Sequence, residues 1–152
     1  FYNYFKSKEE VFEAIADDSV KRFRPLLNEI RESADTFEDY IRGALGAYFN
    51  FLYKENCASI EAGVPHLALI GVRVDTPEMQ SIFDEIRADL ELVVLRGETP
   101  HVDTEYLTAA AVGIAQEIGE RMLQRRPVDV AGATDFAFAL IRAGAQAVPE
   151  TS

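Results

Sequence analysis

The sequence is poor in the residues that build disulfide frameworks, metal centres or membrane spans. Its 152 residues include one cysteine and two histidines, so an internal disulfide framework is excluded and a Cys/His metal site has no support. We expect Cys57 to be a buried, inert thiol in a reducing cytoplasm. Apolar runs fall well short of the roughly 20 residues of a membrane span, and no signal peptide is visible. These absences predict a cytoplasmic protein without membrane contact, metal or cofactor.

Catalytic signatures are also lacking. The sequence contains no Gly-x-x-x-x-Gly-Lys phosphate loop, no Gly-x-Ser-x-Gly elbow and no His-Glu-x-x-His metal helix. Its adjacent acidic pairs, Glu9-Glu10 and Asp17-Asp18, diverge around a helix and do not converge on one metal ion. We therefore expect no catalytic residues and a protein that is not an enzyme.

Basic residues are outnumbered: 15 Lys and Arg stand against 26 Asp and Glu, for a net charge of −11. Such a charge argues against nucleic-acid binding by the chain as it stands. The first eight residues are the exception, because they contain Lys6 and Lys8 and no acid. The chain alone is therefore not expected to bind DNA.

What the sequence does have is apolar residues spaced three or four positions apart, which marks one face of an α-helix. One helix is predicted from Ser7, which fits a capping box with Glu10, to about Ser33. Pro25 lies within its apolar stripe and predicts a kink in preference to a break. A second helix should run from Thr36 to near Lys54. Residues 55–75 show no clean period and predict short helical turns.

Three further helices begin at recognisable start signals. Thr76-Pro77-Glu78 opens one that Gly97 closes. Asp103 or Thr104 opens the next, which stops at residues 125–127, and Asp129 opens the last. The predicted fold is all-α, a bundle of about five long helices plus short helical pieces.

The opening run Phe-Tyr-Asn-Tyr-Phe-Lys-Ser-Lys-Glu-Glu-Val-Phe resembles the end of the helix-turn-helix in TetR-family transcriptional regulators. That family typically has an apolar residue, two aromatics, His-Phe, then Lys-Ser/Thr-Lys-Glu and an apolar pair. Asn3 replaces the usual second aromatic, and Tyr4 replaces the histidine. The remaining chain matches the family only in its helical pattern.

The resemblance implies that residues 1–6 are the end of a truncated DNA-binding helix-turn-helix, most of which would lie upstream. Residues 7–152 would then be a linking helix plus a ligand-binding and dimerisation domain. The phosphate contacts with operator DNA in the intact protein would be Tyr2, Tyr4, Lys6 and Lys8. Such contacts position a protein without reading bases. Apart from the resemblance, the two lysines are better explained as ordinary solvated charges.

The end of the second predicted helix is unusually aromatic, and two interpretations are open. The rings are core residues, or several of them line an apolar cavity with a few polar groups, as in a ligand pocket. The resemblance implies a pocket, and its apolar lining suits a small apolar or amphipathic effector. The candidate pocket residues are Tyr48, Phe49, Phe51, Leu52, His66, Phe83, Ile86, Glu117 and Ile118.

The last two helices combine small residues with more apolar positions than one buried stripe requires. In a soluble bundle this surplus indicates partner helices, most commonly those of a homodimer, although a tight pair within the chain is the alternative. The resemblance implies a dimeric four-helix interface. The candidate interface residues are Gly113, Phe136, Ala137, Leu140, Ile141 and Gly144.

Together these patterns predict the effector-binding and homodimerisation region of a ligand-responsive TetR-like regulator, in that family most often a repressor. A ligand that prefers the conformation with wrongly spaced recognition helices would release the dimer from DNA. The helix from Ser7 to about Ser33 is the expected transmitter. The alternative is a helical dimerisation module without a small-molecule ligand, in which all the aromatic residues are core.

Overall fold

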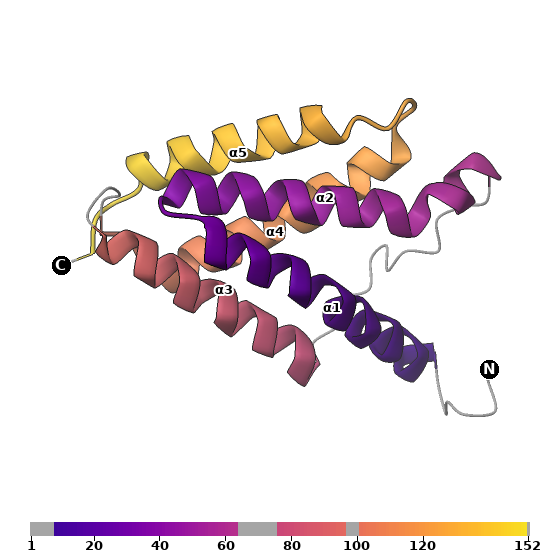
Figure 1. The fold of residues 1–152 in the computed structure, drawn as a ribbon, viewed down its shortest axis with the longest axis horizontal. Helices are drawn as coiled ribbons and strands as arrows, with labels where there is room; N and C mark the ends of the chain where they lie inside the picture. The colour runs from indigo at the N-terminus through magenta and orange to yellow at the C-terminus, as the bar shows by residue number, and fades with distance from the viewer. Residues whose placement is uncertain (1–7, 64–75, 97–100, 152) are drawn as a thin grey trace.

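Apolar periodicity and capping residues divide the chain into five α-helices (Figure 1). The computed structural model describes residues 8–63, 76–96 and 101–151. The helices are α1 (Lys8–Ser33), α2 (Phe37–Glu61), α3 (Pro77–Leu95), α4 (Thr104–Gln124) and α5 (Val130–Ala147). The described residues contain no strand, and the helices pack on one another as a bundle. The predicted all-α bundle is thus confirmed.

Four of the helices begin at a side chain that accepts a hydrogen bond from the backbone N–H three residues later. These caps are Thr36, Thr76, Asp103 and Asp129, with distances of 3.1, 3.2, 3.0 and 2.9 Å. Of the two candidate starts for α4, Asp103 is therefore the cap. The remaining helix, α1, begins at Lys8, directly after Ser7, and that predicted cap lies outside the described residues.

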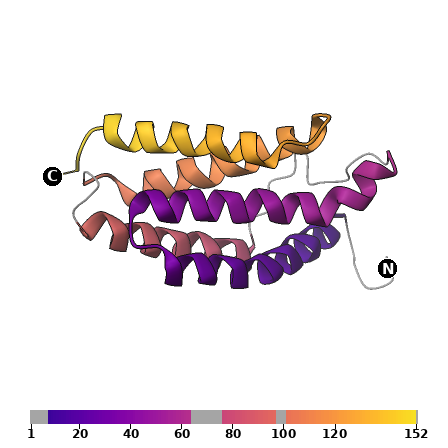
Figure 2. The same ribbon diagram turned by 45° about the horizontal axis from the view of Figure 1, so that its top comes forward.

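The boundaries of α1 and α2 differ in their agreement with the sequence pattern. As expected, α1 continues through Pro25, and its two halves run in different directions (Figure 2). The predicted end of α2 near Lys54 was wrong, because the helix continues to Glu61. Residues 55–61 contain no glycine or proline, so nothing stops the helix before Gly63, whose φ is +69°. The rest of the expected short turns, at residues 64–75, lies outside the described residues, as does Gly97.

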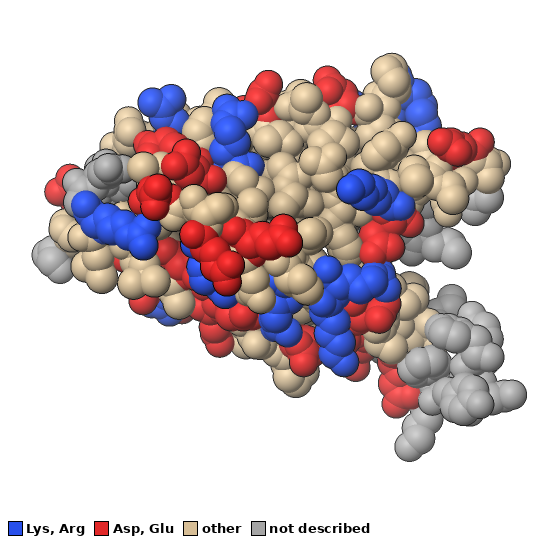
Figure 3. Space-filling model, viewed as in Figure 1, with Lys and Arg blue, Asp and Glu red and all other residues tan. Residues whose placement is uncertain are grey.

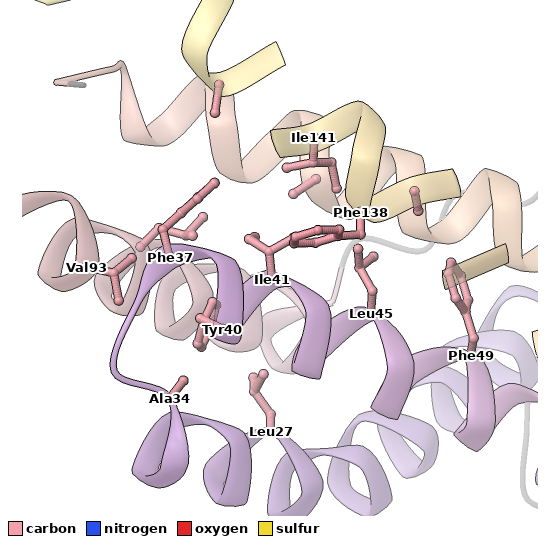
Figure 4. Close-up of a cluster of buried hydrophobic side chains, with 14 of the residues drawn as sticks. Leu27, Ala34, Phe37, Tyr40, Ile41, Leu45, Phe49, Val93, Phe138 and Ile141 are labelled. Atoms are coloured by element: carbon pink, nitrogen blue, oxygen red, sulfur yellow. The ribbon is translucent and has the colours of Figure 1, made fainter. Parts of the chain in front are cut away.

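Helix α2 is the centre of the bundle, since it contacts each of the other four helices. Its Phe37, Tyr40 and Phe49 are at most 2% exposed. Figure 4 shows side chains of α1, α3 and α5 arranged around it, with Phe138 of α5 lying between Ile41 and Leu45. Burying a large apolar side chain contributes about 1.5–3 kcal/mol, so this central helix fixes the positions of its neighbours.

The outer surface over α1 and α3 carries charges of both signs. Over α1 and α3, acidic and basic side chains are interspersed (Figure 3), as the ion pairs between these helices require. Within the described ranges, no helix is both long enough and apolar enough to cross a membrane.

Candidate functional site

An aromatic cluster lies where α1 crosses the middle of α2, as the sequence predicts for the second half of α2. The ring of Phe23 lies 5.6 Å from the ring of Tyr48 in an edge-on arrangement, and 5.6 Å from that of Phe51. The rings of Tyr48 and Phe49 are 5.8 Å apart. Centroid separations of about 4.5–7 Å are favourable for aromatic pairs, so the four rings form one continuous cluster.

Tyr48 places a polar group in this otherwise apolar cluster. Burial raises the pKa of its phenol to about 12, and the nearby charge of Glu120 adds to the effect. The hydroxyl is therefore protonated at neutral pH and keeps its capacity to donate a hydrogen bond. The sequence suggested Glu117 as the acidic contact of the pocket, but that side chain is exposed and Glu120 is the acid that acts on Tyr48.

The space between α2 and α4 beside this cluster is closely packed. A methyl group added at Gly119 would lie 2.5 Å from Leu52 Cδ1 and 3.4 Å from the nearest ring carbon of Phe49. Phe49 is fully buried and Phe51 is 9% exposed. Phe49 and Phe51 are therefore buried in this structure and Leu52 packs beside them, while Tyr48 adds a polar group.

The other predicted pocket residues are less concentrated. Ile86 and Ile118 are half-buried against the core, and Phe83 is half-buried on α3. His66 lies outside the described residues. Two surface grooves, of about 590 and 400 Å³, lie along α3 and between α2 and α5, and none of the predicted pocket residues that the structure describes lines either groove.

A polar network that the sequence did not predict joins α1, α2 and α3. The carboxylate of Asp89, 6% exposed, accepts hydrogen bonds from the Tyr40 hydroxyl and from Arg31 Nε, each at 2.6 Å. Burial and the bond to Asp89 raise the pKa of Tyr40, and the same carboxylate raises the pKa of Arg31. Asp89 and Arg31 form an ion pair in which the carboxylate is nearly buried. The positions of Asp89, Arg31 and Tyr40 therefore depend on one another.

Three further contacts extend this network along α1 and α3, and together they form the α1–α3 seam. Arg24 Nε lies 2.8 Å from Glu85 Oε2, and Arg24 Nη1 lies 3.1 Å from Glu78 Oε2. The Thr76 hydroxyl donates to Asp17 Oδ1 at 2.6 Å. Helix α1 is thus tied to α3 along most of its length. Because the paired residues are more than fifty positions apart in the chain, no local sequence signal could have revealed them.

The outward face of α5 is apolar. Phe136 and Leu140 are 63% and 48% exposed. Gly144 and, on α4, Gly113 are half-buried, and among the described residues no atom lies within 4 Å of a Cβ added at either glycine. Four of the predicted interface residues therefore border the surface.

The other two predicted interface residues, Ala137 and Ile141, belong to the inward face of α5. They are 0% and 4% exposed and pack in the core of the same chain. On a helix that is apolar nearly all round, periodicity does not separate the two faces, which is why the predicted set mixed them. Nothing at these two positions is available to a partner surface.

The remaining candidates offer little chemistry. Among the described residues no group of three or more His, Cys, Asp or Glu could hold a metal ion. Cys57 is half-buried, less than expected, and its Sγ lies 3.5 Å from the carbonyl oxygen of Lys54. Tyr2, Tyr4 and Lys6 lie outside the described residues. Lys8 opens α1, and its side chain is not described.

Comparison with known proteins adds no assignment. No family model, curated protein or solved structure matches this chain. Function must therefore be inferred from the residues and contacts above.

Proposed function

We propose that this chain is the effector-binding and homodimerisation region of a cytoplasmic, ligand-responsive TetR-like repressor that acts by binding and not by catalysis. The observation that carries the proposal is the apolar outward face of α5, in a chain that opens with the residues resembling the end of a helix-turn-helix. On this face the exposed Phe136 and Leu140 lie beside exposed alanines, and contiguous apolar patches mark interaction sites.

The partner best suited to this face is a second copy of the chain. Most soluble homo-oligomers are two-fold dimers in which the same patch occurs on both subunits. The open space beside Gly113 and Gly144 permits close approach of partner helices. Together α4 and α5 of two copies would form the four-helix interface that the resemblance implies.

The effector proposed for the cluster at Tyr48 is a small apolar or amphipathic molecule. The cluster supplies aromatic surface from α1 and α2 and a protonated hydroxyl beside Glu120. Because Leu52 and Phe49 fill the space next to Gly119, a ligand would have to displace these side chains. Entry of the ligand would then separate α2 from α4 or α1, which gives it a differential affinity for a second conformation.

The α1–α3 seam supports α1 as the transmitter. Its ion pairs and the Thr76–Asp17 bond tie α1 to α3, so a displacement of α3 is passed on to α1. In a protein with a complete helix-turn-helix, Tyr2, Tyr4, Lys6 and Lys8 would contact operator phosphates next to the first turn of α1. Moving α1 would change the spacing of the two recognition helices in the dimer.

Thermal unfolding in the presence of a panel of apolar and amphipathic small molecules tests the effector. A ligand at a hundred times its Kd stabilises a folded protein by about 2.7 kcal/mol, a clear rise in Tm. Tyr48→Phe should reduce the response to a polar-headed ligand, whereas Tyr106→Phe, at a position 73% exposed, should not. If no compound raises the Tm, the ligand-free dimerisation module is the better description.

Sedimentation velocity at micromolar concentrations tests the dimer. Phe136→Asp is expected to give a monomer, because it buries an unpaired charge in the proposed interface. The matched control is Leu92→Asp, a residue 55% exposed on α3, which should leave the dimer intact. A wild-type chain that sediments as a monomer would refute the dimer, and with it the proposed function.

A further inference from the structure

The outward face of α5 has an uneven distribution of side-chain size. The large residues Phe136 and Leu140 occupy its first half and middle, and the small exposed residues Ala139, Ala143 and Ala147 run through its middle and second half. Spacings of three and four residues place them on one side of the helix. A face of this kind cannot pack evenly against a copy of itself in parallel, since Phe136 would meet Phe136.

An antiparallel copy removes this conflict. A two-fold axis passing between Ala139 and Leu140 opposes position 136 with position 143 of the partner, and position 140 with position 139. Each large side chain then faces an alanine, which is the alternation that close packing of helices requires.

A groove beside this face provides room for the partner's aromatic ring. The groove measures about 400 Å³ and runs between α2 and α5. Its lining combines the small residues Ala139 and Ala143 with Phe138 and with the polar side chains of Arg42, Asp135, Arg142 and Gln146. The same chain thus carries an exposed aromatic side chain and, seven residues later, a recess next to a small residue. In a two-fold dimer both copies can fill each other's recess at once.

Charge along the groove edge favours the same orientation. Asp135 pairs with Arg42 at 2.9 Å, and Arg42 lies 4.2 Å from the ring centroid of Phe138. Arg142 has no ion-pair partner among the described residues. In the antiparallel register Arg142 comes within about two residues, or about 3 Å along the axis, of the partner's Asp135 position. In a parallel pair the two-fold axis would put the groove edges of the two copies on opposite sides of the interface, so Arg142 would not face the partner's Asp135.

We propose that α5 crosses its copy in the antiparallel direction, with the two-fold axis between Ala139 and Leu140 and Phe136 seated in the partner's α2–α5 groove beside Ala143. This proposal rests on the dimer of the proposed function and specifies its register. Phe136 is then the anchor of the interface, and truncating such an anchor to alanine weakens a dimer by roughly thirtyfold or more.

Single-cysteine crosslinking in a Cys57→Ser background tests the register. Ala139→Cys and Ala143→Cys are matched variants: the same residue type, on the same exposed face, one turn apart. In the proposed register, position 139 lies about one residue from its own copy along the axis, whereas position 143 is about seven residues, or roughly 10 Å, from its copy. A disulfide needs Cα atoms within about 7 Å. We therefore expect oxidation to crosslink Ala139→Cys with itself and to leave Ala143→Cys uncrosslinked.

Mixing two variants gives a second readout. Phe136→Cys with Ala143→Cys should form the mixed disulfide, and Phe136→Cys alone should not crosslink. Equal self-crosslinking of the 139 and 143 variants would show a parallel pair and overturn the proposal. Absence of any α5 crosslink in a chain that sediments as a dimer would also overturn it, while the dimer itself would stand. A monomer in sedimentation would refute the proposed function as well.

Discussion

Replacing Asp89 by alanine is expected to lower the free energy of unfolding by about 2–4 kcal/mol. Asp89 is 6% exposed, and among the described residues it is the only hydrogen-bond acceptor of the buried Tyr40 hydroxyl. Leaving a buried hydroxyl without an acceptor costs about 1–3 kcal/mol. Arg31 loses its 2.6 Å bond as well, but its side chain is 34% exposed, so water offsets part of that loss. A typical domain has only about 5–15 kcal/mol in total.

Urea unfolding followed by circular dichroism measures this change. The protein concentration must be the same for all variants, because dimerisation adds to apparent stability. Tyr40→Phe should cost only about 1 kcal/mol, since Asp89 keeps its bond to Arg31. The Asp89→Ala change should then cost less in the Tyr40→Phe background than alone, with a coupling of about 1 kcal/mol or more.

The control for this series is Asp18→Ala. Asp18 also pairs with an arginine, Arg22, but both side chains are largely exposed, and such pairs contribute about 0–1 kcal/mol. The reasoning would be refuted if Asp89→Ala cost no more than Asp18→Ala. Strict additivity with Tyr40→Phe would also refute it, because the network would then not act as a unit.

Three further predictions concern the packing and ionisation of α2 and α4. Gly119→Ala should lower the Tm, because its methyl group would lie 2.5 Å from Leu52 Cδ1, and overpacking costs about 1–3 kcal/mol. Gly113→Ala, whose added Cβ has no described atom within 4 Å, should raise the monomer's free energy of unfolding in urea by up to about 1 kcal/mol through helix propensity. Equal effects of Gly119→Ala and Gly113→Ala would contradict the close packing at Gly119. The pKa of Tyr48 is raised from 10 to about 12, so the stability due to its neutral phenol is complete below about pH 10 and is lost as the pH rises towards 12. Tyr48→Phe should therefore lose less stability than the wild type in urea unfolding across that range, by up to about 1.4 kcal/mol per pH unit.

Sequence reasoning succeeded where the signals are local. Thr36, Thr76 and Asp129 were assigned as helix starts because a cap needs only its own side chain and the next turn. The predicted end of α2, near Lys54, was wrong because no residue there breaks a helix. The helix ends shortly before Gly63, which has a left-handed backbone conformation. Local signals thus fix helix starts better than helix ends when the chain has no proline or glycine to mark the end.

The candidate sites were less predictable, for two physical reasons. Periodicity shows that α5 is apolar but not which apolar side faces its own core, so Ala137 and Ile141 were grouped with the truly exposed Phe136. The Asp89 network joins residues 49 and 58 positions apart, and such pairs are set by the packing of helices. The aromatic residues of α2 do cluster with Phe23 of α1, yet the filled space beside them depends on the close approach of Gly119, which only the fold determines.

The hydroxyl of Thr76 has two tasks, because it accepts from the Met79 amide at 3.2 Å and donates to Asp17 of α1 at 2.6 Å. The first turn of α3 and the docking of α1 therefore share one oxygen atom, in a residue that is only 5% exposed. A single backbone amide, that of Met79, consequently serves as an intrinsic reporter of α1. The hydrogen–deuterium exchange of the Met79 amide should quicken whenever α1 leaves α3. One NMR cross-peak can therefore follow the position of α1, although Asp17 and Thr76 are 59 positions apart in the chain.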